Sequence, residues 1–161
     1  MVRELDPDRL GDHIDRLFRA AWALTGSPAD AEDLVQETYV RVLAKRRVLR
    51  SDDELGYLLT VLRNTFFETH QKRQRAPSPA DPADFHEVED RRSPGAHEAL
   101  EAREVYAVVQ GLPDAHRDVV VAVDVVGLSY KETAKALDVR IGTVMSRLSR
   151  GRDQVAKALG A

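Results

Sequence analysis

The sequence of 161 residues contains no cysteine. Disulfides, thiolate metal sites and cysteine nucleophiles are therefore excluded together. No apolar run is as long as a membrane span, and the first residues lack the apolar core of a signal peptide. We therefore expect a cytoplasmic protein that does not insert directly into the membrane.

Signatures of catalysis are also missing. The chain has no glycine-rich phosphate-binding loop and no H-E-x-x-H motif. The histidines are scattered over different segments and form no pair at helical i, i+4 spacing: His13, His70, His86, His97 and His116. A metal site needs several such ligands at one place. We therefore expect no metal, no cofactor and no catalytic residue, which makes a hydrolase or metalloenzyme the least favoured alternative.

Charge is plentiful, but the two signs concentrate in different segments. Charged residues make up 32% of the chain, and the net charge is −3. Residues 63–75 and 138–161 are net basic, whereas residues 30–37 and 80–92 are net acidic. Both basic segments fall on expected helices. A nucleic-acid partner is therefore compatible with the negative total, because the distribution of charge matters more than its sum.

Apolar residues recur at helical spacing, and the period-two alternation typical of strands is absent. The expected fold class is all-α, with two small helical modules joined by a flexible linker. Residues 8–75 should form a three-helix bundle, in which the sequence SPAD at 27–30 caps a helix after Gly26. Residues 76–94 contain four prolines and predict the linker, or an extended loop. Residues 95–161 should form the second module.

Residues 127–152 have the pattern of a helix-turn-helix. Ala134 offers the small side chain that lets a second helix approach, and Asp138 tolerates a left-handed turn. Val144 and Leu148 lie one turn apart and should face the first helix. The opposite face carries hydroxyl and guanidinium groups suited to phosphates and base edges: Thr143, Ser146, Arg147, Ser149 and Arg150. The alternative is an ordinary helical hairpin with a solvated basic face.

Two motifs and their order resemble a known family. The first is DAEDLVQE at residues 30–37, followed by a helix that contains RN at 63–64. The second is GTVMSRL at residues 142–148, beyond the linker. The chain resembles an extracytoplasmic-function (ECF, group 4) RNA polymerase sigma factor of the sigma-70 family. The resemblance implies region 2 over residues 8–75 and region 4 over 95–161, in a protein that directs core RNA polymerase to specific promoters.

The resemblance also implies roles for the matching residues. The helix near residue 30 would dock on the clamp helices of the largest polymerase subunit through Asp30, Asp33, Leu34, Gln36 and Glu37. The helix over 55–75 would read and melt the −10 element through Arg63, Asn64, Phe67, Lys72, Arg73 and Arg75. The second helix of the helix-turn-helix would read the −35 element through Arg140, Thr143, Ser146, Arg147, Ser149, Arg150 and Arg152.

The chain departs from the family pattern at several points. Met145 stands where members usually carry Lys or Arg, so the −35 specificity of relatives cannot be carried over. Asp138 replaces the common turn glycine, while Glu68 and His70 interrupt the basic 63–75 segment. Phe67 is either packed in the core or turned outward, where it would stack on an unpaired base.

The expected partners are core RNA polymerase, promoter DNA and, by resemblance, a separate anti-sigma factor. Residues 80–90 carry five acids and no Lys or Arg. They either occupy nucleic-acid sites of the polymerase, screen the basic faces, or form a solvated spacer. Two other functions remain open. One is a helix-turn-helix regulator that acts without docking on polymerase, and the other is a sigma mimic that binds an anti-sigma factor without touching DNA.

Overall fold

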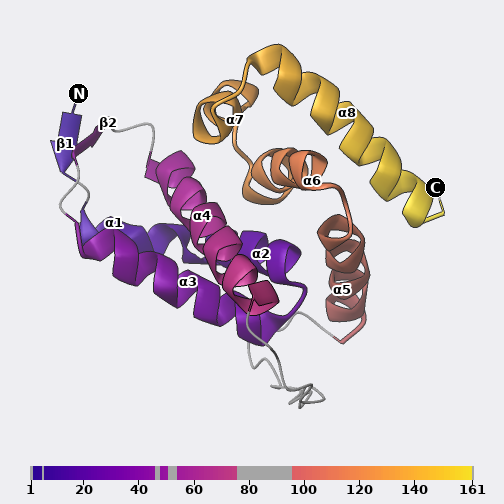
Figure 1. Cartoon of the computed structure of the whole chain (residues 1–161), viewed down its shortest axis with the longest axis horizontal. Helices are drawn as coiled ribbons and strands as arrows, with labels where there is room; N and C mark the ends of the chain where they lie inside the picture. The colour runs from indigo at the N-terminus through magenta and orange to yellow at the C-terminus, as the bar shows by residue number, and fades with distance from the viewer. Residues whose placement is uncertain (1, 5, 46–47, 51–53, 76–95, 161) are drawn as a thin grey trace.

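Helices dominate the computed structural model, which describes residues 2–4, 6–45, 48–50, 54–75 and 96–160 (Figure 1). The expected all-α class is confirmed. The expected linker at 76–94, with its acids, lies outside the described residues. One small element was not expected: β1 (Val2–Glu4) pairs antiparallel with β2 (Val48–Arg50). Each strand has three residues, which is too short for an alternating pattern to show.

The first module consists of α1 (Pro7–Leu10), the 3-10 turn η1 (Gly11–His13), α2 (Ile14–Thr25), α3 (Pro28–Leu43) and α4 (Glu54–Arg75). Helix α2 ends at Gly26, whose φ of +75° favours glycine. Ser27 then caps α3, because its hydroxyl accepts a hydrogen bond of 3.4 Å from the Asp30 amide. The end of one helix at Gly26 and the start of the next at Ser27 therefore lie where the sequence predicts them.

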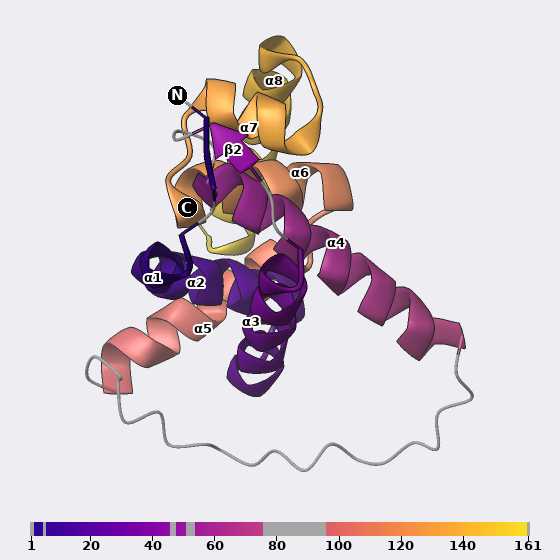
Figure 2. The ribbon, with the colours of Figure 1, turned by 90° about the vertical axis from the view of Figure 1, so that its left-hand side faces the viewer.

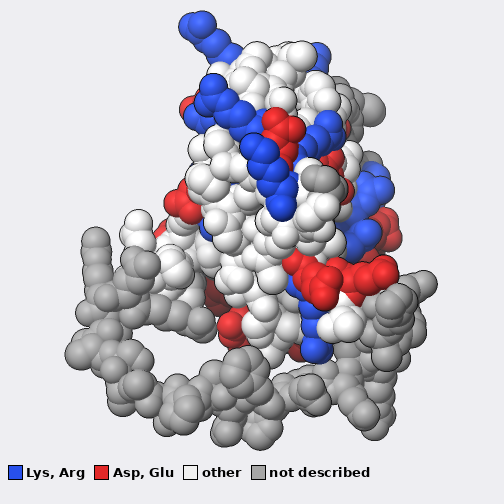
Figure 3. Space-filling view, turned by 90° about the vertical axis from the view of Figure 1, so that its right-hand side faces the viewer, with Lys and Arg blue, Asp and Glu red and all other residues white. Residues whose placement is uncertain are grey.

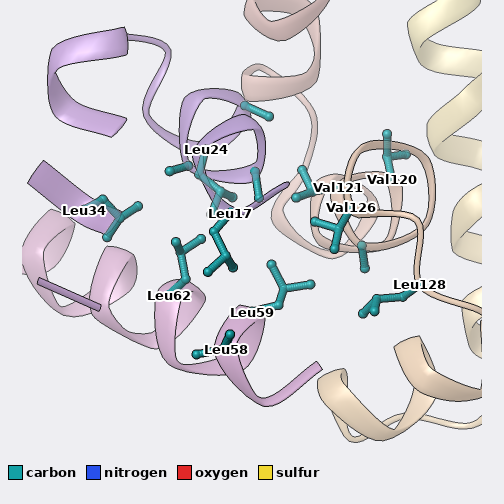
Figure 4. Close-up of a cluster of buried hydrophobic side chains, with 14 of the residues drawn as sticks. Leu17, Leu24, Leu34, Leu58, Leu59, Leu62, Val120, Val121, Val126 and Leu128 are labelled. Atoms are coloured by element: carbon teal, nitrogen blue, oxygen red, sulfur yellow. The ribbon is translucent and has the colours of Figure 1, made fainter. Parts of the chain in front are cut away.

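Helices α2, α3 and α4 pack as a three-helix bundle around fully or nearly buried leucines. Leu17 of α2 faces Leu58 and Leu62 of α4, and Leu34 closes the core from α3 (Figure 4). Figure 2 shows the C-terminal half of α4 extending away from the other helices. Accordingly, residues 68–72 of this half are exposed.

The second module consists of α5 (Ala96–Gln110), α6 (Asp114–Val120), the π-helical segment η2 (Val121–Val126), α7 (Tyr130–Leu137) and α8 (Ile141–Ala158). Ser129 and Glu132 form a capping box at the start of α7, each side chain bonding the other's backbone amide. Asp138 takes the left-handed turn conformation with φ of 54°. Val144 and Leu148 of α8 are buried, as a helix-turn-helix requires.

The two modules share one apolar core. Helix α2 packs on α5 and η2, and α4 packs on α7. In Figure 4, Leu59 of α4 lies near Val121 and Val126 of η2. Polar contacts cross the same boundary: the Thr60 hydroxyl lies 3.1 Å from the Ala136 carbonyl oxygen. Because each module is small, sharing a core increases the apolar surface that each one buries. The two modules are therefore docked on each other through the described helices.

None of the described helices combines the length and the apolar character that are needed to cross a membrane.

Candidate nucleic-acid interface

Helix α8 presents a basic and hydroxyl-rich face. It begins after Arg140, whose backbone is extended, and packs inward through Val144, Leu148 and Gly151. Arg140, Ser146, Ser149 and Arg150 are exposed, while Thr143 and Arg147 are half-buried. In Figure 3, lysines and arginines gather over the upper end of the molecule, where α7 and α8 lie. The structure therefore brings most of the expected −35 readers to one accessible side.

Arg152, one of the expected −35 readers, is held by an acidic side chain within the chain. Its Nε donates to Oδ2 of Asp124 at 3.0 Å, and its Nη2 donates to Oδ1 of Asp124 at 2.7 Å. These hydrogen bonds raise the pKa of the guanidinium above its ordinary value. The pair joins α8 to η2, so Arg152 contributes to the placement of α8 on its support.

The acidic face of α3 is exposed as expected for Asp33, Gln36 and Glu37, whereas Asp30 is half-buried. Glu37 accepts a hydrogen bond of 3.1 Å from Arg41, and Arg41 also bonds Glu68 of α4 at 2.6 Å. Leu34 is 7% exposed and belongs to the core. In this conformation Leu34 therefore supports the acidic face from beneath.

The expected −10 readers on α4 divide into three groups. Asn64 and Lys72 are exposed. Arg73 and Arg75 lie on α4, but their side chains are outside the described residues. Arg63 and Phe67 are partly buried against the second module. Arg63 Nε donates to Oδ2 of Asp118 in α6 at 2.7 Å, and the Arg63 guanidinium lies 4.9 Å from the centre of the Phe67 ring.

Two charged residues of α6 that the sequence did not single out complete this contact. Arg117 is 7% exposed, and its guanidinium lies 5.6 Å from the centre of the Phe66 ring. Burial raises the pKa of the Asp118 carboxyl, although Arg63 acts in the opposite direction. Within the described part of the chain, Oδ1 of Asp118 has no hydrogen-bond partner. Neighbouring charges on a helix usually indicate a solvated face, so no sequence signal pointed to this pair.

A cleft of about 1000 Å³ lies beside this contact. It is lined by Asp33 and Glu37 of α3, Phe66 and Phe67 of α4, and Arg117 of α6. The acidic face and the aromatic part of the α4 surface therefore open into one space between the modules. Among the described residues, no cluster of His, Asp or Glu has the arrangement of a metal site.

Comparisons with known proteins decide the family. The family model for sigma-70 region 2 matches residues 10–76, and that for sigma-70 region 4 matches residues 102–155. The ECF RNA polymerase sigma factor EcfG of Rhodopseudomonas palustris is 33% identical over 147 residues, which cover 91% of this chain and 80% of EcfG. The chain belongs to the ECF RNA polymerase sigma factors.

A second relative supports the same family assignment, although the match covers only part of that relative. The sigma factor SigE of Mycolicibacterium smegmatis is 36% identical over 146 residues, but these cover 57% of SigE and 89% of this chain. The chain thus spans little more than half of that relative. Among solved structures, the sigma factor RpoE of Bartonella quintana, in complex with the anti-sigma factor NepR, matches with a TM-score of 0.74 at 24% identity over 96% of both chains. This likeness shows the shared fold of the sigma factor.

Proposed function

We propose that this sigma factor binds core RNA polymerase and directs initiation at promoters that it recognises by their −10 and −35 elements. The observation that carries the proposal is that one chain holds region 2 and region 4 in order, with a basic recognition helix exposed on region 4. The chain acts as a specificity subunit and catalyses no reaction itself. Its site of action is the cytoplasm, where the polymerase works. Region 2 would occupy residues 8–75 and region 4 residues 95–161.

Docking on polymerase is assigned to the exposed side of α3. Asp33, Gln36 and Glu37 are accessible there, and Asp30 lies half-buried in the first turn, close to the Ser27 cap. Leu34 holds this side on the bundle core. We assign the surface to the clamp helices of the largest polymerase subunit, since acids in an accessible row attract a basic partner surface.

Promoter reading is assigned to α8 and α4. On α8 the −35 contacts are Arg140, Thr143, Ser146, Arg147, Ser149 and Arg150, with Arg152 holding Asp124. On α4 the −10 contacts are Arg63, Asn64, Phe67 and Lys72, together with Arg73 and Arg75. Because Asp118 and Arg117 now hold Arg63 and Phe67, α4 and α6 must separate before these two side chains reach a −10 strand.

We also propose a protein regulator for this chain. Two solved relatives are described as complexes: RpoE with the anti-sigma factor NepR, and CnrH with the cytosolic domain of CnrY. A separate anti-sigma protein is therefore the expected inhibitor here. The space between the modules, with its acids and aromatic rings, is a surface that such a protein could occupy.

The test is run-off transcription with core polymerase on a promoter library, with and without this protein. We expect defined start sites that depend on the protein. Specific duplex binding without any effect on polymerase would instead favour an independent helix-turn-helix regulator. Binding to neither DNA nor polymerase would favour a sigma mimic. Either result would contradict the proposed function.

A further inference from the structure

Two large apolar side chains are exposed at the start of α8. Ile141 is 46% exposed and Met145 is 53% exposed. They lie one helical turn apart, so they form a short row on one side of the helix. Ser149 continues the row one turn later and is also exposed. Neither apolar residue contributes to the buried stripe, which runs through Val144, Leu148 and Gly151.

The surroundings of this row match DNA in charge. From residue 139 to residue 152 the chain contains four arginines and no Asp or Glu. Ser146 and Arg150 are exposed beside the row. The row also falls in the first two turns of the second helix of a helix-turn-helix, the part that contacts base edges in the major groove. Because of these charges and this position in the helix-turn-helix, we take DNA as the partner of the apolar row.

The major groove contains one apolar group on its base edges, the C5 methyl of thymine. A methionine side chain is unbranched and polarizable, so it adapts to such a methyl without a fixed hydrogen-bond geometry. It cannot pair with a phosphate or with guanine, as an arginine or a lysine would. The apolar character of the row therefore selects among bases.

We propose that Met145, with Ile141 one turn before it, reads thymine methyl groups in the −35 element and makes a T·A pair the preferred pair there. The inference rests on the proposed function and adds the specificity-determining residues. Each methyl removed from water by this contact is worth about fourfold in affinity.

The experiment begins with holoenzyme, reconstituted from the full chain and core polymerase, and a promoter pool with a randomised −35 segment. Selected promoters are then remade with deoxyuridine in place of each thymine, which removes one methyl and nothing else. Transcription and duplex binding are measured for the wild type, Met145→Ala and Met145→Lys. Leu159→Ala is the matched control, because Leu159 is 44% exposed directly after the last residue of the same helix.

We expect selection of thymine at one or more −35 positions and a loss of about fourfold on uracil substitution there. Met145→Ala should reduce the difference between thymine and uracil at the position that Met145 contacts, whereas Leu159→Ala should retain it. Met145→Lys should lose the thymine preference and steepen the salt dependence by about one counterion.

Three results would overturn the inference. They are selection without thymine, equal use of thymine and uracil by the wild type, and a Met145→Ala defect that is the same on both DNAs. The last result would mean that Met145 acts other than through a thymine methyl group. A holoenzyme that selects no sequence at all would contradict the proposed function itself, and this inference with it.

Discussion

At the scale of single residues, glycine has two opposite roles on α8. Gly151 sits where α8 crosses α6, and a Cβ there would lie 2.6 Å from Cγ2 of Val120. Gly142 faces open space, with nothing within 4 Å of the same position. We expect Gly151→Ala to lower the free energy of unfolding by about 1–3 kcal/mol through overpacking.

Gly142→Ala is the matched control on the same helix. It should raise the free energy of unfolding by up to about 1 kcal/mol, since alanine is the better helix former. Denaturant unfolding of both variants measures the difference. An equal effect of the two substitutions would contradict the packing of α8 on α6.

Asp118 gives a prediction for the dependence of stability on pH. Burial raises its pKa in the folded chain above the ordinary 3.8. A raised carboxyl pKa favours the folded state at low pH, and this contribution is lost as pH rises from about 3.8 through the folded pKa. Asp118→Asn should remove this component, so the pH profiles of wild type and variant should diverge across that interval. Unfolding free energies of both proteins, measured from about pH 3 to about pH 7, test this prediction. Parallel profiles would contradict a raised pKa of Asp118 in the folded chain.

At the scale of elements, α8 carries the −35 prediction. Arg150→Ala should lower the affinity of holoenzyme for a −35-dependent promoter by about 1–3 kcal/mol and reduce the salt slope by about one. The exposed Arg103 of α5 provides the control, because Arg103→Ala removes the same charge from a helix outside the recognition face. Competition binding at several salt concentrations gives both quantities. Wild-type transcription by the Arg150 variant would show that the recognition face is wrongly assigned.

Helix α3 carries the polymerase prediction. Reversing Asp33 and Glu37 to Lys should weaken binding to core polymerase while the fold is retained, because both side chains are exposed. The substitution also breaks the exposed pair between Glu37 and Arg41, which costs at most about 1 kcal/mol. Glu104→Lys on α5 is the control for added positive charge. A pull-down with core polymerase tests the difference, and undiminished binding of the double variant would reject the surface.

At the scale of the whole molecule, we expect the ion pair between Arg63 of α4 and Asp118 of α6 to contribute to the docking of the two modules. Asp118→Lys would place a third cation beside Arg63 and Arg117, and we expect the modules to separate. The chain contains no cysteine, so Lys72→Cys and Lys157→Cys introduce two unique labelling sites on α4 and α8. The distance between the labels should lengthen and broaden in the Asp118 variant.

Glu104→Lys is the control for this experiment, because Glu104 is an exposed acid on α5 and not on α6. It adds the same charge without facing Arg63. Circular dichroism distinguishes separation of intact modules from unfolding. An unchanged distance in the Asp118 variant would show that the shared apolar core alone holds the modules together.

Local features of this protein followed from the sequence by itself. The Ser27 cap, the left-handed Asp138 turn and the buried pair Val144 and Leu148 all depend on residues within a few positions of one another. The same holds for the exposure of Asp33 and Glu37, since helical periodicity places them outside the buried stripe of α3, which runs through Ala31, Leu34, Val35, Thr38 and Val42. Capping and periodicity act through neighbours in the chain, so they can be read before the chain is folded.

Contacts between distant segments were decided only by the tertiary structure. Arg63 and Asp118 are 55 positions apart, and Arg152 and Asp124 are 28 apart. In the sequence, each of these residues is indistinguishable from a solvated surface charge. Arg63 gains its partner only because α6 lies against α4, and Arg152 gains its partner only because η2 lies against α8. The docking of the modules has the same origin: Leu59 and Val126 each signal a buried face, but neither indicates which face will cover it. Apolar attraction has no direction, so shape complementarity of the folded helices makes that choice.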